Sequence, residues 1–221
     1  MAYKAVIFDL DGTLLDTLAE IGDAMNTALK NRGLPTHPIE RYRHFIGEGP
    51  RVLVERALPE NRRSEPLMTD CLNDYIEIYS RNFGKSTRVY EGIPELLDAL
   101  TRHRLMLAVL SNKRHTLTIR SVDRFLSDWH FHMVLGLRDS VARKPDPAGA
   151  LEIAGALGVP SERIAYLGDS GTDIQTARAA GMFPVGVLWG TRSQEELETA
   201  GAGAVIDKPK KALDILLPKG V

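Results

Sequence analysis

The sequence predicts an α/β protein with a Rossmann-like parallel sheet core and an inserted all-helical domain. Short apolar runs alternate with helical patterns along most of the chain, which is typical of βαβ units. Between residues 17 and 85 the apolar positions have helical spacing and no strand pattern occurs. We therefore expect residues 1–16 and 86–221 to form the discontinuous sheet core and residues 17–85 to form a separate helical domain.

The first strand is expected at Ala5–Phe8, because a continuous apolar run is typical of a strand buried on both faces. A helix should follow, with Thr17 and Glu20 as the capping box at its start and Gly33 at its end. One more apolar stripe predicts a second long helix in the inserted domain: Leu72, Tyr75, Ile76, Tyr79 and Phe83.

The rest of the chain alternates between strand and helix patterns. Five further strands are expected, at Leu105–Leu110, Met133–Leu135, Ile164–Leu167, Val185–Leu188 and Ala204–Ile206. Helices are expected around Ile93–Leu100, after Lys113, at Ala148–Leu157, after Gly168, after Ser193 and at the end of the chain. Ser193 and Glu196 should cap the short helix that follows them. This alternation supports a parallel sheet.

The composition excludes several classes of protein. Of the 221 residues, 43% are hydrophobic and 26% are charged, as in an ordinary globular protein. The formal net charge of -1 offers no basic field to nucleic acid or to an anionic membrane. The single cysteine, Cys71, cannot form an internal disulfide, and no apolar run reaches the roughly 20 residues of a membrane span. We expect a cytoplasmic protein, monomeric or homodimeric, without nucleic-acid or membrane partners.

Polar residues follow three of the predicted strands at the point where each strand ends. Asp9 and Asp11 follow the first strand, Ser111 and Asn112 the second, and Asp169 a later one. Because ligands of open parallel sheets bind at the carboxyl ends of the strands, we expect a functional site there. A lysine, at position 144, also follows a predicted strand, though less directly.

Four aspartates of this predicted site offer the hard oxygen ligands that suit Mg²⁺: Asp9, Asp11, Asp169 and Asp173. Asp169 and Asp173 are four residues apart, which places both on one face of a helix expected to begin there. A plain turn at Asp11 and helix capping by Asp169 or Ser170 are alternative interpretations. A calcium-binding EF-hand loop is disfavoured, because Leu14 stands where that loop needs glycine.

Four segments together resemble the motifs of the haloacid dehalogenase-like (HAD) phosphatases: DLDGT at 9–13, SNK at 111–113, RKPDP at 143–147 and GDSGTD at 168–173. They follow the order of the family's motifs at suitable spacing, and the resemblance covers essentially the whole chain. The inserted helical domain resembles the C1-type cap of this family. The resemblance implies a Mg²⁺-dependent phosphatase that acts on a small phosphorylated metabolite through an aspartyl phosphate.

The resemblance also implies a role for each motif residue. Asp9 would be the nucleophile and Asp11 the general acid and base; on a strand, positions two apart point the same way. Lys144 would bind the phosphoryl oxygens as part of the catalytic set. Asp9, the Asp11 backbone carbonyl and Asp169 would hold Mg²⁺, with Asp173 positioning Asp169 or a metal-bound water. The implied substrate-binding residues are Gly12, Thr13, Ser111, Asn112 and Lys113.

A finer resemblance is to bacterial phosphoglycolate phosphatases, in DTLAEIGDAMNTAL, FIGEGPRVLVERAL and GMFPVGVLWG, and it implies 2-phosphoglycolate as the substrate. The glycine-rich GEGPR segment at 47–51 is expected to place Arg51 where its guanidinium could bind the substrate carboxylate; a solvated Arg51 is the alternative. Pyrophosphatase, nucleotidase and sugar phosphatase activities stay open. A β-phosphoglucomutase-like isomerase is disfavoured, because Ile21 stands where such mutases resemble one another in a histidine.

Overall fold

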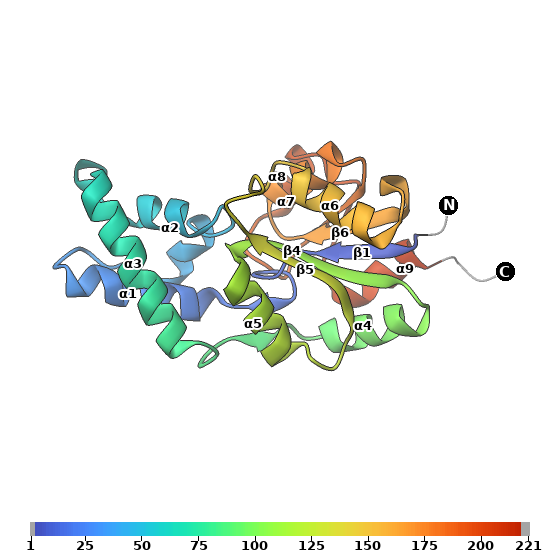
Figure 1. Ribbon diagram of the computed structural model, residues 1–221, viewed down its shortest axis with the longest axis horizontal. Coiled ribbons are helices and arrows are strands. Elements are labelled where there is room, and N and C mark those ends of the chain that lie inside the picture. The colour runs from blue at the N-terminus through green and yellow to red at the C-terminus, as the bar shows by residue number, and fades with distance from the viewer. Residues whose placement is uncertain (1–2, 218–221) are drawn as a thin grey trace.

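A six-stranded parallel sheet lies at the centre of the computed structural model, which describes residues 3–217 (Figure 1). The strands lie in the order β5-β4-β1-β6-β7-β8. Their bounds are β1 Ala5–Phe8, β4 Met106–Arg114, β5 Phe131–Leu137, β6 Ile164–Gly168, β7 Phe183–Val187 and β8 Ala204–Ile206. The α/β fold is therefore confirmed. The strand order reverses between β1 and β6, and the ligand site of a Rossmann-like sheet lies at such a reversal.

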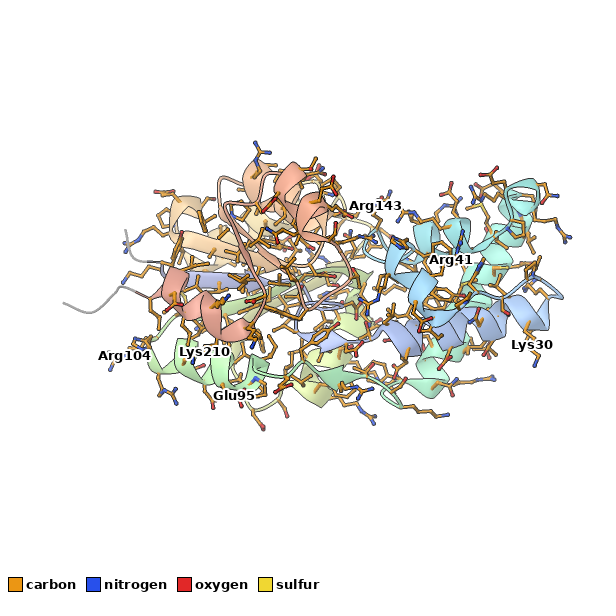
Figure 2. The ribbon with its side chains drawn as sticks, turned by 180° about the vertical axis from the view of Figure 1, so that it is seen from behind. Lys30, Arg41, Glu95, Arg104, Arg143 and Lys210 are labelled. Atoms are coloured by element: carbon orange, nitrogen blue, oxygen red, sulfur yellow. The ribbon has the colours of Figure 1, made fainter. Side chains whose placement is uncertain are left out.

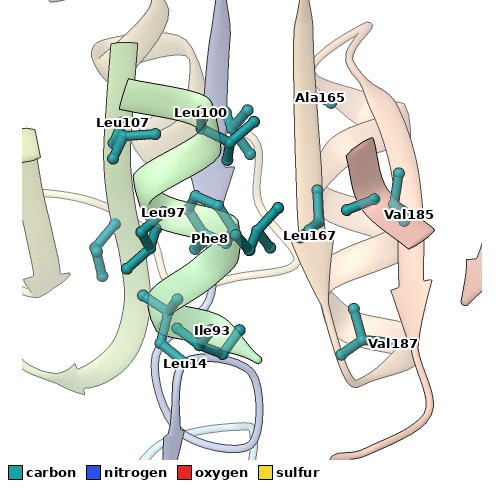
Figure 3. Packing of buried hydrophobic residues seen from close by; sticks show 14 of the residues in the cluster. Phe8, Leu14, Ile93, Leu97, Leu100, Leu107, Ala165, Leu167, Val185 and Val187 are labelled. Carbon is teal, nitrogen blue, oxygen red and sulfur yellow. The ribbon is translucent and has the colours of Figure 1, made fainter. Parts of the chain in front are cut away.

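Helices cover both faces of this sheet, because successive side chains of a strand point to opposite faces. Val6 and Phe8 of β1 pack on the side of α4, and Figure 3 shows Phe8 beside Leu97 and Leu100 of that helix. Ala5 and Ile7 pack on the side of α6 and α7. The helices around the sheet are α4 Ile93–Arg102, α5 His115–Phe125, α6 Ala148–Leu157, α7 Gly171–Ala179, α8 Gln194–Thr199 and α9 Ala212–Leu216.

The segment between β2 (Leu15–Asp16) and β3 (Arg88–Val89) is helical and has a hydrophobic core of its own. Its elements are α1 Leu18–Asn31, the 3₁₀ turn Ile39–His44, α2 Pro50–Ala57, the 3₁₀ turn Glu60–Arg62 and α3 Glu65–Asn82. Met25, Tyr42, Cys71 and Tyr79 are among the residues of its core, which is separate from the two cores that flank the sheet. Figure 1 shows these helices at one end of the molecule, beyond the edge of the sheet where the strands end. We call this segment the helical domain.

Two short helical turns and a two-stranded ribbon complete the described chain. The remaining 3₁₀ turns are Ser161–Arg163 and Pro209–Lys211. The ribbon pairs β2, Leu15–Asp16, with β3, Arg88–Val89, in antiparallel fashion. The sequence analysis missed this ribbon, because two-residue strands carry no periodic pattern. It joins the two chain segments that connect the helical domain to the sheet core. Within the described residues, no helix has both the length and the apolar character needed to cross a bilayer.

The predicted capping box at the start of α1 is wrong. Thr17 is the N-cap residue, but its side chain makes no capping hydrogen bond. The carboxylate of Glu20 is buried and accepts backbone N–H groups from three residues on the other connecting segment: Gly84 (2.9 Å), Ser86 (3.1 Å) and Thr87 (3.2 Å). Glu20 therefore ties the entry and the exit of the helical domain together, across more than 60 residues of chain.

Replacing Glu20 should destabilise the protein, because three backbone N–H groups would lose their acceptor. We expect Glu20→Ala to lower the free energy of unfolding by about 1–3 kcal/mol. Urea unfolding followed by circular dichroism measures this change. Asp23→Ala, at an exposed position of the same helix, should change it by less than about 0.5 kcal/mol. Equal effects of the two substitutions would contradict the proposed tie.

Candidate active site

Asp9 and Asp11 follow β1, and both line one cavity. The N–H of Asp9 donates to the Leu167 carbonyl at 2.9 Å, which extends the pairing of β1 with β6 by one residue. The chain then turns around the carbonyl of Leu10, which accepts three backbone N–H groups, from Thr13, Leu14 and Leu15. Both aspartates line the same cavity, as expected for residues two positions apart after a strand.

Lys144 lies beneath this cavity and joins two of the aspartates. Its ammonium group donates to Asp9 Oδ1 (2.8 Å), Asp173 Oδ1 (2.6 Å) and the carbonyl of Leu110 (3.1 Å). Burial alone would lower the pKa of Lys144, but the carboxylates of Asp173 and Asp9 outweigh it and raise this pKa well above its ordinary value. Lys144 is therefore a permanent cation inside the site.

Asp169 is held at the end of β6 by residues that follow β7. Its Oδ2 accepts the N–H (2.8 Å) and the hydroxyl (2.6 Å) of Thr191, and its Oδ1 accepts the hydroxyl of Thr13 at 3.4 Å. The backbone approaches closely here: a Cβ at Gly190 would lie 2.3 Å from the Cβ of Asp169. Gly12, with a φ of 89°, is equally confined, since its Cβ would lie 2.4 Å from Asp169 Oδ2.

Asp173 caps α7 and supports Lys144 at the same time. Ser170 is the N-cap residue and forms a full capping box with Asp173, whose Oδ2 accepts the Ser170 hydroxyl at 2.6 Å. The helix begins at Gly171, so the expectation that Asp169 and Asp173 share a face of this helix is wrong: Asp169 precedes it. The two carboxylates still converge, because Asp169 ends the strand and Asp173 belongs to the first turn.

The donor set fits a divalent cation. Carboxylate oxygens of Asp9, Asp169 and Asp173 lie within 4.8 Å of one another. Desolvation raises the pKa of Asp9 well above its usual value, although Lys144 lowers it, and desolvation with the neighbouring Asp173 raises the pKa of Asp169 to about 6. The cations around these two buried carboxylates therefore do not fully neutralise them. Oxygen ligands in this number suit Mg²⁺.

Ser111 and Asn112 lie in the extended end of β4, next to the same cavity. The hydroxyl of Ser111 accepts the N–H of Lys113 at 3.2 Å. The side chain of Asn112 donates to the carbonyls of Gly47 (3.0 Å) and Lys144 (3.1 Å) and accepts the N–H of Lys144 at 2.9 Å. Asn112 thus holds the backbone of Lys144 and, through Gly47, contacts the helical domain.

Lys113 lies on the wall of the cavity beside Asp11. Its ammonium group donates to Asp11 Oδ1 and to the hydroxyl of Tyr79, both at 2.8 Å. Burial alone would lower the pKa of Lys113, but Asp11 and Tyr79 outweigh it and raise this pKa above its ordinary value. Around this pair the wall is mainly apolar, and it is formed by Ile21, Ile46, Pro50, Leu53, Tyr75, Ile76 and Leu117.

Three arginine side chains hold the helical domain against the core, and each donates to a backbone carbonyl: Arg43 to Gly190 (2.8 Å), Arg192 to Ile46 (2.9 Å) and Arg143 to Glu48 (2.9 Å). Figure 2 shows Arg143 at the junction between the two parts of the molecule. Arg192 also donates to the carbonyl of Arg43. These contacts close the helical domain over the cavity.

Not every residue predicted for the site lines the cavity. Gly12 and Thr13 lie against Asp169 instead, where they shape the carboxylate cluster. Arg51 points away: its guanidinium donates to both carboxylate oxygens of Glu65, at 2.6 and 2.7 Å, and its side chain is 51% exposed. The expectation that Arg51 reaches the site is therefore not met, because Glu65 at the start of α3 offers it a partner on the surface.

Two contacting residues were missed by the sequence analysis. Thr191 holds Asp169, and Tyr79 binds Lys113. Thr191 follows β7 and belongs to no recognisable motif, so only the fold brings it to Asp169. Tyr79 was interpreted as part of an apolar helix stripe; its buried ring agrees with that interpretation, but its hydroxyl faces the site.

Comparison with known proteins places this site in a family. Residues 6–187 match the family model described as haloacid dehalogenase-like hydrolase. A phosphoglycolate phosphatase of Chromobacterium violaceum is 30% identical, over 96% of this chain and 96% of that protein. One from Psychrobacter arcticus is 30% identical, over 98% of this chain and 97% of its own length. A crystal structure of a proposed phosphoglycolate phosphatase from Lactobacillus delbrueckii subsp. bulgaricus superposes with a TM-score of 0.93, at 31% identity, over 99% and 100% of the two chains.

The class of protein follows from the fold and the family match together: it is a hydrolase with an α/β fold, whose carboxylate cluster lies beside the ends of β1 and β6. The chain belongs to the haloacid dehalogenase-like hydrolase family, and within it resembles the phosphoglycolate phosphatases.

Removing the buried cation should destabilise the protein strongly, because Asp9 and Asp173 would lose their shared partner. We expect Lys144→Met to cost about 3–5 kcal/mol in the free energy of unfolding. The loss should be larger at about pH 8 than at about pH 5, since Asp9, whose pKa is raised, can take up a proton at lower pH and then needs no cation. Thermal unfolding at both pH values measures this. Lys30→Met, at an exposed position, is the control; a loss that did not depend on pH would contradict this account.

Proposed function

We propose that the protein is a Mg²⁺-dependent phosphatase of small phosphate monoesters and that 2-phosphoglycolate is its substrate. The observation that carries the proposal is the pair Asp9 and Asp11, which line one cavity beside the cluster of Lys144, Asp169 and Asp173. The names of the relatives support both the reaction and the substrate. The proposal keeps the expectation of a cytoplasmic monomer or homodimer.

In the first half-reaction a carboxylate oxygen of Asp9 attacks phosphorus, and the bond from phosphorus to the ester oxygen breaks. Asp11 donates a proton to the departing ester oxygen, which leaves as an alcohol. Lys144 neutralises the charge that Asp9 would otherwise share with Asp173 and orients the attacking carboxylate. The product of this step is a phosphoryl group on Asp9.

In the second half-reaction water attacks the phosphoryl group, Asp11 accepts a proton from that water, and inorganic phosphate leaves a free Asp9 carboxylate. The hydroxyl of Ser111 and the N–H of Asn112 bind the phosphoryl oxygens in both steps. Asp9, Asp169 and the Asp11 carbonyl would hold Mg²⁺, which supplies charge neutralisation between carboxylate and phosphate. The helical domain, residues 17–85, acts as the cap that excludes bulk water.

The cavity wall supports a small leaving group. Sugars and nucleosides carry hydroxyl and amide groups that need polar partners. Beyond the end of the cavity formed by Asp9, Asp11, Ser111 and Asn112, the wall is mostly apolar apart from Lys113, Tyr79 and Arg114. Ile21, only 5% exposed, fills the place where a mutase would need a polar group for its second phosphoryl transfer. Hydrolysis of a compact monoester therefore remains the best-supported reaction.

The nucleophile is tested by Asp9→Asn. This variant should lose turnover of 2-phosphoglycolate entirely, because an amide cannot accept the phosphoryl group. Beryllofluoride, a mimic of an aspartyl phosphate, should give a bound fluorine NMR signal with the native enzyme and none with the variant. EDTA should abolish native turnover and added Mg²⁺ should restore it. Residual turnover by Asp9→Asn would contradict the assignment of Asp9 as the nucleophile.

The general acid is tested by Asp11→Asn. We expect a loss of about 10²–10⁴-fold in kcat for 2-phosphoglycolate. The loss should be much smaller for p-nitrophenyl phosphate, whose leaving group departs without a proton. Steady-state kinetics with both esters measures the difference. If both substrates lose the same factor, Asp11 does not protonate the leaving group.

A further inference from the structure

Lys113 and Tyr79 meet on the cavity wall directly beside Asp11. The Lys113 ammonium donates to Tyr79 Oη and to Asp11 Oδ1, both at 2.8 Å, and lies 4.8 Å from the centroid of the Tyr79 ring. The Lys113 side chain is only 7% exposed. Lys113 belongs to β4 of the core and Tyr79 to α3 of the helical domain, so the pair exists only where the two parts of the molecule meet.

The phosphoryl group does not account for this pair. Lys144, Ser111 and Asn112 already lie next to Asp9 for that purpose. Among the described residues that line the cavity, the cations are Lys113 and Arg114, and Arg114 is exposed. Lys113 is therefore the buried positive charge of an otherwise apolar wall. A buried ammonium is costly unless anions surround it, and Asp11 supplies one of them.

We propose that Lys113 and Tyr79 form a carboxylate clamp, which binds an acidic group on the leaving group of the substrate. This inference rests on the proposed phosphatase function and names its substrate class: phosphate monoesters with a carboxylate one carbon atom from the ester oxygen. Asp11 must contact the ester oxygen to protonate it, and Lys113 contacts Asp11. A carboxylate that close to the ester oxygen therefore lies within reach of Lys113.

Tyr79 supplies the second donor of the clamp. Its hydroxyl oxygen accepts a hydrogen bond from Lys113, and a hydroxyl in that position can still donate its own hydrogen. Burial raises the pKa of Tyr79 to about 12, against the effect of Lys113, so the phenol keeps this hydrogen at physiological pH. One ammonium and one phenol, in contact with each other, offer a carboxylate a donor for each of its oxygens.

The clamp also gives the helical domain a part in specificity. Tyr79 reaches Lys113 only when α3 packs over the end of β4. A substrate with a carboxylate would thus add contacts on both sides of the junction and favour the closed arrangement. A neutral ester would gain only the phosphate contacts of the core. This assigns to Lys113 and Tyr79 the role that the sequence suggested for Arg51, which pairs with Glu65 instead.

The test compares two esters that differ mainly in charge: 2-phosphoglycolate and 2-hydroxyethyl phosphate. In the native enzyme kcat/KM should favour 2-phosphoglycolate. Lys113→Met should reduce that preference by about tenfold or more, and Tyr79→Phe by about fivefold, as expected for a charged and a neutral hydrogen bond. Lys113→Arg should restore part of the preference, because it keeps the cation. Using the ratio of the two esters removes any general effect of Lys113 on Asp11.

Binding without turnover gives a second measurement. Calorimetry with 3-phosphonopropionate and with propylphosphonate, which lacks the carboxylate, should show the same change in preference in both variants. Arg81→Met, an exposed cation of α3, and Tyr3→Phe, at the far end of the sheet core, should leave the preference unchanged.

Two outcomes would overturn the clamp. The first is an equal loss for the charged and the neutral compound in Lys113→Met and Tyr79→Phe. The second is a preference that changes with Arg51→Ala and not with Lys113→Met. In either case hydrolysis by the native enzyme would leave the phosphatase function standing. If the native enzyme hydrolysed none of these esters while beryllofluoride failed to bind, the proposed function itself would fall.

Discussion

The active site is organised by the excess of negative charge at the ends of β1 and β6. Four carboxylates, those of Asp9, Asp11, Asp169 and Asp173, meet two ammonium groups, those of Lys113 and Lys144. Each ammonium neutralises part of that charge. Burial, together with repulsion from the neighbouring carboxylates, raises the pKa of Asp9 and of Asp169. A site left negative in this way attracts a divalent cation, and with that cation in place it can accept a phosphate dianion. Folding and catalysis therefore depend on the same balance of charge.

Most of the hydrogen bonds described across the junction of the helical domain and the core accept at backbone carbonyls, whereas the bond from Lys113 to Tyr79 joins two side chains. Asn112 binds the carbonyl of Gly47, and three arginines bind carbonyls on the opposite side of the junction. Carbonyl groups are present whatever the side chain, so this arrangement leaves the cavity-facing side chains of the helical domain free to set specificity. Glu20 holds the two connecting segments in the same backbone-directed way. These bonds and the proposed recognition by Lys113 and Tyr79 therefore use different atoms, although the Lys113–Tyr79 bond also crosses the junction.

The sheet and the carboxylates could be predicted from sequence because their signals are local. An apolar run followed by Asp9 indicates a buried strand and also shows at which end of that strand the polar site residues lie. Features that depend on residues distant in the sequence could not be predicted. The position of Glu20 predicted a capping residue, whereas in the structure its carboxylate accepts the N–H of Gly84. Arg51 is a second example. The glycine-rich turn before it contacts the site through the carbonyl of Gly47, but the side chain of Arg51 forms an ion pair with Glu65. The spacing of the motifs along the chain predicted that this segment approaches the site. It did not predict which atoms of the segment make the contact.

With the roles proposed for Ser111, Asn112 and Lys113, the motif at the end of β4 would couple phosphate binding, closure and leaving-group recognition. The strand continues past Leu110 to Arg114, and its register with β5 shifts between these two residues, so Ser111, Asn112 and Lys113 lie in an irregular stretch whose side chains reach different partners. Asn112 joins Lys144 to the helical domain, whereas Lys113, two positions after Ser111, reaches Asp11 and Tyr79. A shift of this one strand end would disturb all three functions together. A strand gives such a motif a rigidity that a loop would not, because β1 and β5 pair with its first half on both sides.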